Sequence, residues 1–371
     1  MHLEVDLERV RLGEGPTPVR ELSHLAEEGG RAAVWLKDDG SYSEVGGNKA
    51  RKLEWLLAQA AARGKRTIVT GGAVGTNHGL ATALFARRLG MATVLVLVPQ
   101  PDSPHVRRQL DRLRRSGAEL HFASGLFRAH LTGARLLLAR TRPPLNIPYV
   151  LRPGGSVPLG CVGYVEAALE LSAQVARGEL PPPSHVFVAL GSGGTAAGLA
   201  AGMKLAGLRS RLVCVLVNDV VRVDETRVAR LARRTLRLVG RHGVDVDGVD
   251  IEAGEIDVLR GWLGDGYGHA TPEAGRAIHL LAEREGVTLD PVYTGKAMAA
   301  LLELNRRGAL GEGPVLYWHT FKEAPVEASD EVAVQARGPG PCGSRRDPAH
   351  SASPDDRSAS PPWEAKPRSR R

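Results

Sequence analysis

One stretch of the sequence presents an amine for reaction. Residues 45–54 read Val-Gly-Gly-Asn-Lys-Ala-Arg-Lys-Leu-Glu, so two glycines and an amide precede Lys49 and a helix-favouring run follows it. Glycine lets the backbone turn closely, which places the lysine at the start of a helix. A lysine presented in this way can attack the carbonyl of a cofactor aldehyde or of a substrate ketone. The alternative is a solvated lysine after a glycine turn. The reactive interpretation requires a site elsewhere in the chain that binds the cofactor or substrate carrying the carbonyl.

A glycine-rich loop between an apolar run and a small-residue run supplies such a site. Apolar residues 186–190 precede the loop and small residues 196–199 follow it; the loop consists of Gly191, Ser192, Gly193, Gly194 and Thr195. Unpaired amides at a helix N-terminus bind phosphate, and glycine makes them approachable. Two hydroxyls in the loop suit one terminal phosphate. Together with the presented lysine, a single phosphate indicates pyridoxal phosphate.

The same loop also fits a dinucleotide fingerprint. Its glycines match G-x-G-x-x-A, and Asp219 follows 28 positions after Gly191 as a candidate ribose acid. That acid usually lies about 20 residues after the motif, which weakens the match. An NAD(P) site therefore remains a rival, and so does a tight glycine turn that binds no ligand.

These groups need a scaffold of strands and helices to bring them together. The apolar patterns predict strands at residues 31–37, 67–70, 92–98, 185–190, 212–217 and 315–319. Helical patterns cover residues 49–62, 79–89, 106–116, 163–177 and 271–285. Strands that alternate with helices in this way predict βαβ units and a parallel sheet. The three prolines at 181–183 separate two such units.

Composition and charge narrow the class of protein. The chain has 371 residues, which is long enough for two domains or one large α/β domain. The net charge is +8, but residues 336–371 hold eight Lys or Arg against four Asp or Glu, so half of the excess lies there. No basic helix with interleaved aromatic residues is present. We therefore expect no nucleic-acid partner.

The cysteines and the hydropathy pattern indicate a location. Cys161, Cys214 and Cys342 are far apart and form no CxxC pair, which argues against a disulfide framework and a zinc site. No histidines or cysteines have metal-ligand spacing, so we expect no metal. No signal segment opens the chain and no apolar run approaches about 18 residues. The expectation is a cytoplasmic protein without membrane contact.

Four separated segments resemble one family. They are residues 46–54, residues 72–78, residues 191–195, and a run from Asp290 to Ala297 that reads Asp-Pro-Val-Tyr-Thr-Gly-Lys-Ala. Their types and order resemble the D-cysteine desulfhydrase and 1-aminocyclopropane-1-carboxylate deaminase family of pyridoxal-phosphate enzymes, which have the tryptophan-synthase β-type fold. The resemblance extends over roughly residues 10–320.

The resemblance implies roles in binding the cofactor. Lys49 would be the Schiff-base lysine, and Lys52, one turn later on the same helical face, would help to hold the phosphate. Asn77 would hydrogen-bond the ring hydroxyl of the cofactor, and the loop Gly191, Ser192, Gly193, Gly194 and Thr195 would cup its phosphate.

It also implies roles toward the substrate. Tyr293 would be the active-site tyrosine, with Tyr267 as a second, although both could simply pack. Thr76 stands where the family usually has a serine that meets the substrate carboxylate or exchanges protons with the substrate. Its hydroxyl is kept and its methyl narrows the pocket. His78 could carry a proton or pack beside the cofactor.

Four positions depart from the family or divide it. At Gly75 the family commonly has glutamine, so we expect a lost polar contact and additional space. At Thr294 the ring-opening deaminases carry a glutamate near the pyridine nitrogen, whereas the D-cysteine desulfhydrases carry threonine. A carboxylate would favour a protonated pyridinium, the stronger electron sink. With threonine, a substrate with a good leaving group is expected.

After His319 and Thr320 the family has two glycines, and replacing them by Phe321 and Lys322 is expected to prevent a close backbone approach.

The pattern as a whole predicts an α/β protein with two doubly wound domains and mostly parallel sheets. The resemblance implies that this fold is tryptophan-synthase β-like, known as pyridoxal-phosphate fold type II. Residues 1–50 and 161–330 are expected to form a large cofactor-binding domain. Residues 51–160 would form a small inserted domain and residues 331–371 a disordered tail. The cofactor would lie in the cleft between the domains.

The activity that the resemblance implies is that of a lyase or deaminase acting on a small amino acid. The expected reaction is α,β-elimination of D-cysteine or a related β-substituted amino acid to a keto acid and ammonia, with Lys49 removing the α-proton and Tyr293 or Thr76 assisting. The alternatives are a 1-aminocyclopropane-1-carboxylate deaminase, an NAD(P)-binding oxidoreductase, and a catalytically impaired pyridoxal-phosphate-binding homologue, the last suggested by Phe321 and Lys322. The family also implies a homodimer.

Overall fold

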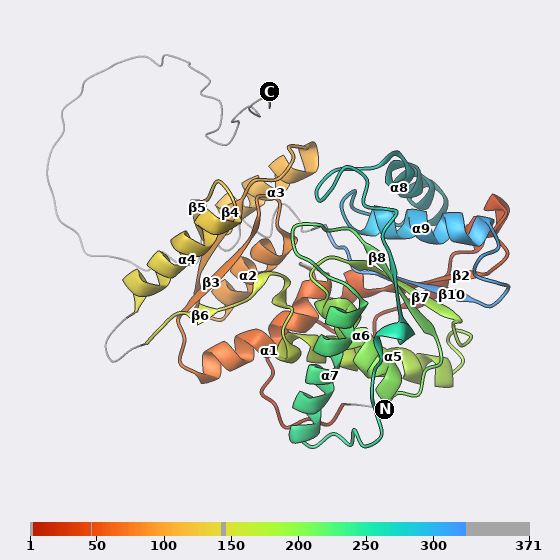
Figure 1. Ribbon diagram of the computed structural model, residues 1–371, viewed down its shortest axis with the longest axis horizontal. Coiled ribbons are helices and arrows are strands. Elements are labelled where there is room, and N and C mark those ends of the chain that lie inside the picture. Colours follow the sequence, from red (N-terminus) through yellow and green to blue (C-terminus); the bar gives the residue numbers. More distant parts are fainter. Residues whose placement is uncertain (1–2, 46, 142–145, 324–371) are drawn as a thin grey trace, which may run out of the picture.

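The computed structural model describes residues 3–45, 47–141 and 146–323 and contains two β-sheets, each with helices against it (Figure 1). We call the six-stranded sheet with its helices the larger lobe and the four-stranded sheet with its helices the smaller lobe. Residues 331–371, expected to be disordered, lie outside the described residues. Within the described ranges, no helix is both long and apolar enough to cross a membrane.

The larger lobe is built on a mostly parallel sheet. Its strands lie in the order β1 (Val19–Glu21), β2 (Val34–Asp38), β10 (Val315–His319), β7 (His185–Leu190), β8 (Arg211–Leu216) and β9 (Ile256–Leu259). Only the pairing of β1 with β2 is antiparallel in this described sheet. Every residue of β10 is buried, as expected for a central parallel strand covered on both faces.

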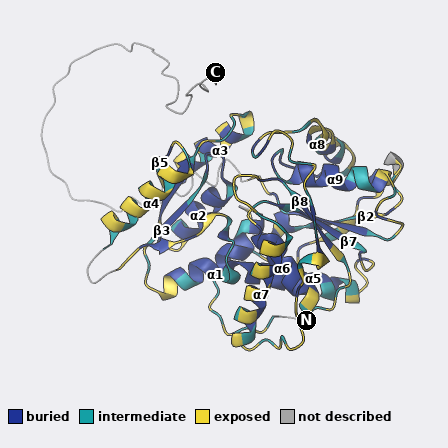
Figure 2. Cartoon of the chain, in the orientation of Figure 1, coloured by how far each residue is buried: buried dark blue, intermediate teal, exposed yellow. Residues whose placement is uncertain are grey.

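Helices cover both faces of this sheet (Figures 1 and 2). One face carries α5 (Pro158–Ala176), α6 (Gly194–Leu205) and α7 (Glu225–Arg241), and the other carries α8 (Pro272–Glu285) and α9 (Thr294–Arg306). Side chains of a strand alternate between faces. Along β7, Val186, Val188 and Leu190 accordingly join the core under α5 and α6, whereas Phe187 joins the core under α9.

The smaller lobe has a parallel sheet in the order β5 (Glu119–Phe122), β4 (Ala92–Val98), β3 (Thr67–Ala73) and β6 (Tyr149–Val150). Its helices are α1 (Asn48–Ala62), α2 (Asn77–Arg88), α3 (Pro104–Arg115) and α4 (Leu126–Arg140). Of the short 3-10 helices, Ser23–Glu28 packs on α8 and Ala253–Glu255 on α7 in the larger lobe, whereas Asp39–Tyr42 and Pro153–Gly155 contact α1. All four strands fall within the predicted range 51–160. The division into domains at those residues stays a prediction.

Helix α1 belongs to both lobes, which matters because it begins beside Lys49. Leu53, Leu56 and Leu57 are buried in the core of the smaller lobe. On another side of the helix, Trp55 packs with Val162 of α5 in the larger lobe. The start of α1 is therefore held in place from both sides.

Candidate active site

A cavity of about 1030 Å³ lies between the lobes and collects most of the predicted site residues. The carboxyl end of β3 and that of β7 both open into it, which is where open α/β sheets bind ligands. The residues of the sequence motifs that line it are Asn48, Lys49, Lys52, Gly72, Ala73, Thr76, Asn77, His78, Gly191, Ser192, Gly193, Gly194, Thr195, Tyr267, Asp290, Tyr293, Thr320, Phe321 and Lys322. Segments distant in sequence thus converge on one space.

The glycine motif before Lys49 has a geometric cause. Gly47 has φ 48° and precedes the first turn of α1. A Cβ atom on Gly47 would lie 2.3 Å from the carbonyl oxygen of Thr320, which no side chain tolerates. The next amide, of Asn48, donates to that same oxygen at 3.2 Å. The turn therefore needs glycine, and it fixes where the lysine begins its helix. Gly46 lies outside the described residues.

The environment of Lys49 favours the neutral form of its amine. The side chain lines the cavity, and its Nζ donates to Asn48 Oδ1. Desolvation by burial, together with the positive charge of Lys52, lowers the pKa of Lys49 from its ordinary value near 10.5 to about 7, against the opposing charge of Asp290. A large fraction of this amine is therefore neutral, and nucleophilic, near pH 7.

The glycine loop forms a concave cradle at the start of α6. Gly193, the residue before the first turn, has φ 87° and no side chain of its own to cap the helix. Its first amides and the positive end of its dipole consequently face the cavity. A Cβ atom on Gly194 would lie 2.6 Å from Ser156 Oγ and 3.0 Å from Lys52 Nζ, so any side chain would fill the space. An amine, a cation and open amides together fit a phosphate-bearing aldehyde.

Ser156 completes this cradle, although the sequence motifs did not single it out. Its Oγ accepts from the amide of Gly194 at 3.1 Å and lies 2.7 Å from Ser192 Oγ. The preceding loop also holds Lys52, whose Nζ donates to the carbonyl of Gly154 at 3.2 Å. Burial lowers the pKa of Lys52 to about 8. The signal in the sequence is the run Pro-Gly-Gly-Ser at 153–156, whose proline and glycines indicate a turn.

The start of α2 lies across the cavity from this cradle. Thr76 caps the helix, since its Oγ1 accepts from the amide of Gly79 at 3.1 Å. Asn77 Oδ1 accepts from Gln109 Nε2. Burial, with the charges of Lys49 and Lys52, lowers the pKa of His78 to about 3, so its ring is neutral. Because a ring of such low basicity does not take up a proton at neutral pH, the structure supports packing of His78 beside the cofactor and not a role in carrying protons.

The space expected at Gly75 is not there. A Cβ atom at this position would meet Val106 Cγ2 at 3.2 Å and Gln100 Oε1 at 3.3 Å. Gln100 Oε1 also accepts from the amide of Gly75 at 3.2 Å. The expectation of a lost polar contact and an opened pocket is therefore wrong, because another segment supplies a glutamine and fills the volume.

Two tyrosines form a pair on the larger lobe. The hydroxyls of Tyr267 and Tyr293 lie 2.6 Å apart, and their rings pack edge to face at 5.9 Å. Burial raises the pKa of both. Lys296 donates from Nζ to the carbonyl of Leu263 at 2.7 Å and so holds the loop that carries Tyr267. Both hydroxyls therefore remain protonated at neutral pH.

Thr294 lies behind the cavity wall, and Asp290 lines the cavity in its place. Thr294 is buried, and its Oγ1 donates to Asp290 Oδ2 at 2.6 Å. Asp290 Oδ1 accepts from the amides of Val292 and Tyr293 at 2.9 and 2.7 Å, and Oδ2 also accepts from the amide of Thr294 at 3.1 Å. The carboxylate is thus saturated by the first turn of α9. The family resemblance gave no role to Asp290 within the run from Asp290 to Ala297.

Asp219, the candidate ribose-binding acid of a dinucleotide site, instead accepts a hydrogen bond from the backbone. Asp219 Oδ1 accepts from the amide of Tyr267 at 3.0 Å, which ties it to the tyrosine loop. This contact speaks against the dinucleotide reading of the glycine loop.

The loop after β10 makes the close approach that we expected its side chains to prevent. Besides the contact of Thr320 with Gly47, a Cβ atom on Gly40 would lie 2.3 Å from the carbonyl oxygen of Phe321. The expectation was wrong, because the glycines that permit the contact lie in the facing segments. The ring of Phe321 is buried, lines the cavity and lies 6.3 Å from the ring of His105 in α3. It therefore bridges the two lobes.

Comparisons with known proteins agree with this geometry. The family model described as "Pyridoxal-phosphate dependent enzyme" matches residues 10–320. A D-cysteine desulfhydrase of Klebsiella pneumoniae subsp. pneumoniae is 35% identical, covering 84% of this chain and 93% of that protein. A D-cysteine desulfhydrase of Salmonella choleraesuis is 36% identical, covering 84% and 93%. The crystal structure of an ACC deaminase homologue superposes with a TM-score of 0.74 at 31% identity, covering 88% of this chain and 96% of that one.

Proposed function

The chain belongs to the pyridoxal-phosphate dependent enzymes, and on that premise we propose that it cleaves D-cysteine or a related β-substituted amino acid to a keto acid and ammonia, releasing the β-substituent. The observation that carries the proposal is Lys49, an amine with a pKa of about 7 that faces the same cavity as a phosphate-sized cradle. With D-cysteine and water, the products would be pyruvate, sulfide and ammonia.

The residues for holding the cofactor lie on two helix starts. When bound, pyridoxal phosphate supplies an aldehyde that condenses with amines and a ring that accepts the negative charge left by removal of a neighbouring proton. The first amides of α6 and the hydroxyls of Ser192 and Thr195 would hold the phosphate, with Lys52 as its counter-charge. Asn77 would contact the ring hydroxyl. Lys49 would provide the attachment point.

Lys49 also has the properties of the base in this proposal. With a pKa of about 7, its Nζ can accept the α-proton of the substrate at neutral pH and later return it. The hydrogen bond from Nζ to Asn48 Oδ1 directs the amine. Few other side chains at this site could act as a base, since His78 has a pKa of about 3.

The start of α2 would receive the substrate carboxylate. The positive end of the helix dipole and the amides near Asn77 and His78 favour a negative group there. Thr76 Oγ1 accepts a hydrogen bond within the helix, so its own proton remains to be donated outward. Thr76 would therefore orient the carboxylate.

The tyrosine pair faces the substrate from the larger lobe. Because burial raises the pKa of Tyr293 and Tyr267, each hydroxyl would donate a proton or a hydrogen bond and would not act as a base. The hydrogen bond between the two hydroxyls, 2.6 Å apart, orients one of them to donate a hydrogen bond to a departing thiolate. We assign this role to Tyr293, with Tyr267 positioning it.

The surroundings of Thr294 favour elimination over ring opening. Its hydroxyl already donates to Asp290, and that carboxylate already accepts four hydrogen bonds. Neither group is available as an unpaired anion that would raise the basicity of the cofactor ring. A substrate whose β-substituent leaves easily needs less help from the ring, which supports a thiol-bearing amino acid.

An amino-acid panel tests this function. Protein reconstituted with pyridoxal phosphate is given D-cysteine, L-cysteine, β-chloroalanine and 1-aminocyclopropane-1-carboxylate in turn, and keto acid, sulfide and ammonia are measured. The proposal predicts pyruvate and sulfide from D-cysteine, with no product from Lys49→Ala. Turnover of the cyclopropane substrate alone would instead establish a deaminase. Cofactor binding without turnover of any substrate would establish the catalytically impaired homologue, which Phe321 and Lys322 motivate.

A homodimer and a cytoplasmic location belong to the same proposal. The homodimer rests on the family resemblance, and sedimentation of the purified protein tests it. A reducing compartment is supported by Cys161 and Cys214, which are both buried and free.

A further inference from the structure

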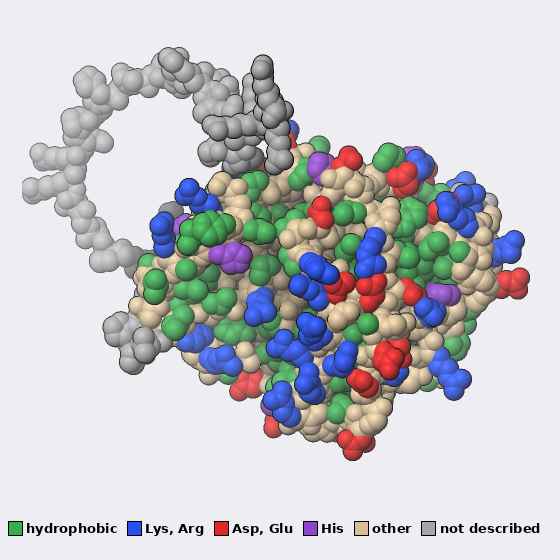
Figure 3. Space-filling model, viewed as in Figure 1, with side chains coloured by type: hydrophobic (Ala, Val, Ile, Leu, Met, Phe, Trp, Pro, Cys, Tyr) green, Lys and Arg blue, Asp and Glu red, His purple; other side chains and the backbone are tan. Residues whose placement is uncertain are grey.

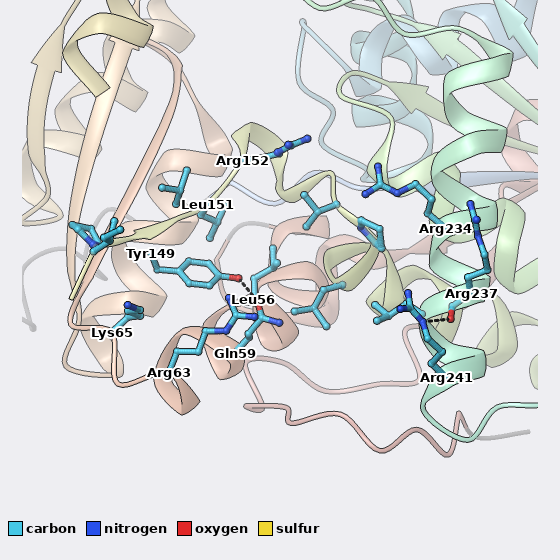
Figure 4. Close-up of a pocket in the computed structure, with 17 residues that line it drawn as sticks. Leu56, Gln59, Arg63, Lys65, Tyr149, Leu151, Arg152, Arg234, Arg237 and Arg241 are labelled. Atoms are coloured by element: carbon cyan, nitrogen blue, oxygen red, sulfur yellow. Dashed lines mark hydrogen bonds between the residues drawn. The ribbon is translucent and has the colours of Figure 1, made fainter. Parts of the chain in front are cut away.

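A second cavity, also of about 1030 Å³, lies beside the active site on the other side of the segment after β6. Val150, Leu151 and Arg152 line both cavities, so one segment of chain separates them. Its walls come from both lobes, with the end of α1 and β6 on one side and α7 on the other (Figure 4). None of the roles proposed above uses this space.

Cationic side chains surround this cavity. Arg234, Arg237 and Arg241 extend along α7, and Arg63, Lys65 and Arg152 lie on the facing elements (Figure 4). Blue side chains gather over α7 in the space-filling view (Figure 3). Within the described part of the chain, no Asp or Glu lines the cavity. A hollow lined by one sign of charge concentrates the opposite charge in it.

The arginines of α7 that line the cavity differ from a neighbour on the same helix. Arg233 lies 3.9 Å from Asp250, as surface cations commonly do. Arg234 and Arg237 have no carboxylate within 4.0 Å among the described residues. Arg241 donates to the carbonyl of Arg237 at 3.1 Å, and Lys65 to Asn146 at 3.0 Å, which leaves both charges uncompensated. Unpaired guanidinium groups that converge on one space can share an anion.

The floor of the cavity is apolar. Leu56, Leu151, Leu159 and Leu238 contribute to it, and Tyr149 adds a ring whose hydroxyl donates to Gln59 at 3.0 Å. Apolar walls with a few directed polar groups are typical of small-molecule sites. The combination fits a ligand with an apolar body and several negative charges.

The shape and charge favour such a ligand over a macromolecule. The cations surround a concave space, whereas a nucleic-acid backbone requires cations that follow a stripe. A second copy of the chain placed on a two-fold axis here would set these cations against themselves, which is unfavourable without counter-charges.

We propose that this cavity binds a small organic anion carrying two or more negative charges, at a site separate from that of the cofactor. The occupant would contact Arg152, and the same segment continues to Gly154, which holds Lys52, and Ser156, which holds the amide of Gly194. Holding this segment in place lowers the cost of ordering the phosphate cradle. The anion therefore tightens the binding of pyridoxal phosphate, and the cofactor tightens the binding of the anion in return.

Calorimetric titration of the holoenzyme tests the site. The probes are pyrophosphate, citrate and ATP, in a phosphate-free buffer of low ionic strength, with the cofactor occupying its own phosphate site throughout. The double variant Arg234→Ala/Arg237→Ala is expected to bind the best probe at least about tenfold more weakly. The matched control, Arg128→Ala/Arg135→Ala on α4, removes two exposed charges elsewhere and is expected to bind within about twofold of wild type. Cofactor absorbance checks that each variant is folded.

Three outcomes would contradict the proposed site. No probe binds the wild-type protein, both double variants lose the same affinity for the probe, or neither double variant loses affinity for it. Tighter binding of a 20-nucleotide single strand than of any small probe, lost in the α7 variant, would assign the surface to nucleic acid instead. The link to the cradle has its own readout, the dissociation constant of pyridoxal phosphate with and without the probe. A decrease in wild type but not in the α7 variant supports the link, and no change in wild type contradicts it.

Discussion

Asn48 Nδ2 donates a hydrogen bond to Thr195 Oγ1 at 3.1 Å, across 147 positions of sequence. The other end of the same amide, Oδ1, accepts from Lys49 Nζ. One side chain therefore joins the reactive amine to the last residue of the glycine loop. Because these two motifs come from different parts of the chain, their spacing depends on this contact as well as on the packing of α1.

Asn48→Ala is expected to weaken pyridoxal-phosphate binding by about tenfold, since it removes one hydrogen bond that orients the loop and one that orients the amine. Attachment should still occur at Lys49. Absorbance titration of the apoprotein with the cofactor measures the effect. An unchanged dissociation constant would show that the loop and the amine are positioned without Asn48.

The rate at which Lys49 of the apoprotein reacts with an aldehyde should rise as the pH increases through 7. Burial and Lys52 lower the pKa of Lys49 to about 7, and only the neutral amine attacks an aldehyde. The rate of attachment of pyridoxal, the aldehyde without the phosphate, should therefore increase as pH rises through about 7 and level off above about pH 8. Attachment to a solvated lysine would continue to accelerate toward pH 10. Stopped-flow absorbance distinguishes the two profiles.

Lys52→Met should shift the pH dependence of the rate of pyridoxal attachment to higher pH. Removing the neighbouring positive charge favours the protonated form of Lys49 and raises its pKa, although burial, the larger cause, remains. The same variant should bind pyridoxal phosphate more weakly but pyridoxal little differently, since only the former carries the phosphate. A profile that stays at pH 7 would contradict the electrostatic account.

The other face of α1 should matter for stability. Arg51 is buried, donates to Asp39 at 2.7 Å and lies 3.1 Å from Glu170, so removing it takes the paired cation from buried Asp39, whereas Glu170 keeps Lys37 at 2.6 Å. Arg51→Leu is expected to lower the free energy of unfolding by about 3–5 kcal/mol. The control is Arg306→Leu, which removes an exposed partner of Glu303 and should change little. Urea denaturation compares them, and equal effects would argue against a structural role for Arg51.

Phe321 should restrict the size of the substrate. Its ring is buried and lines the cavity, where the family has glycine. Phe321→Ala opens space, so the ratio of kcat/KM for S-benzylcysteine to that for cysteine should rise by about tenfold or more. His105→Ala, which removes the ring on the opposite lobe, provides the comparison. A ratio unchanged by Phe321→Ala would place the substrate elsewhere in the cavity.

Much of the fold could be predicted because its central strands are simple apolar runs. The strands at 92–98, 185–190 and 315–319 have the predicted bounds. The helix α7 was not predicted, although its buried Val228, Ala232, Leu236 and Val239 recur at helical spacing between arginines. The helix α4 has no buried residue, so its leucines obey no helical burial period.

Some residues of the candidate site could likewise be predicted from the sequence, and others could not. Local motifs indicated Lys49 and the glycine loop because backbone geometry dictates their residue types. Ser156 and Gln100 could not be assigned, since each acts through a contact with a segment distant in sequence. Among the described residues, Asp290 bonds only its own turn, and no spacing rule singles out that local pattern. The wrong expectations at Gly75 and Phe321 have the same cause: the facing residues decide whether space or close approach exists.

The central claim is that Lys49 carries the cofactor, and one measurement tests it most directly. The holoenzyme is reduced with borohydride, digested, and mapped by mass spectrometry, with Lys49→Ala processed alongside. The account predicts the mass of the reduced cofactor on the peptide that contains Lys49, and none in the variant. Attachment to Lys52 or another lysine in wild type, or no attachment at all, would contradict it.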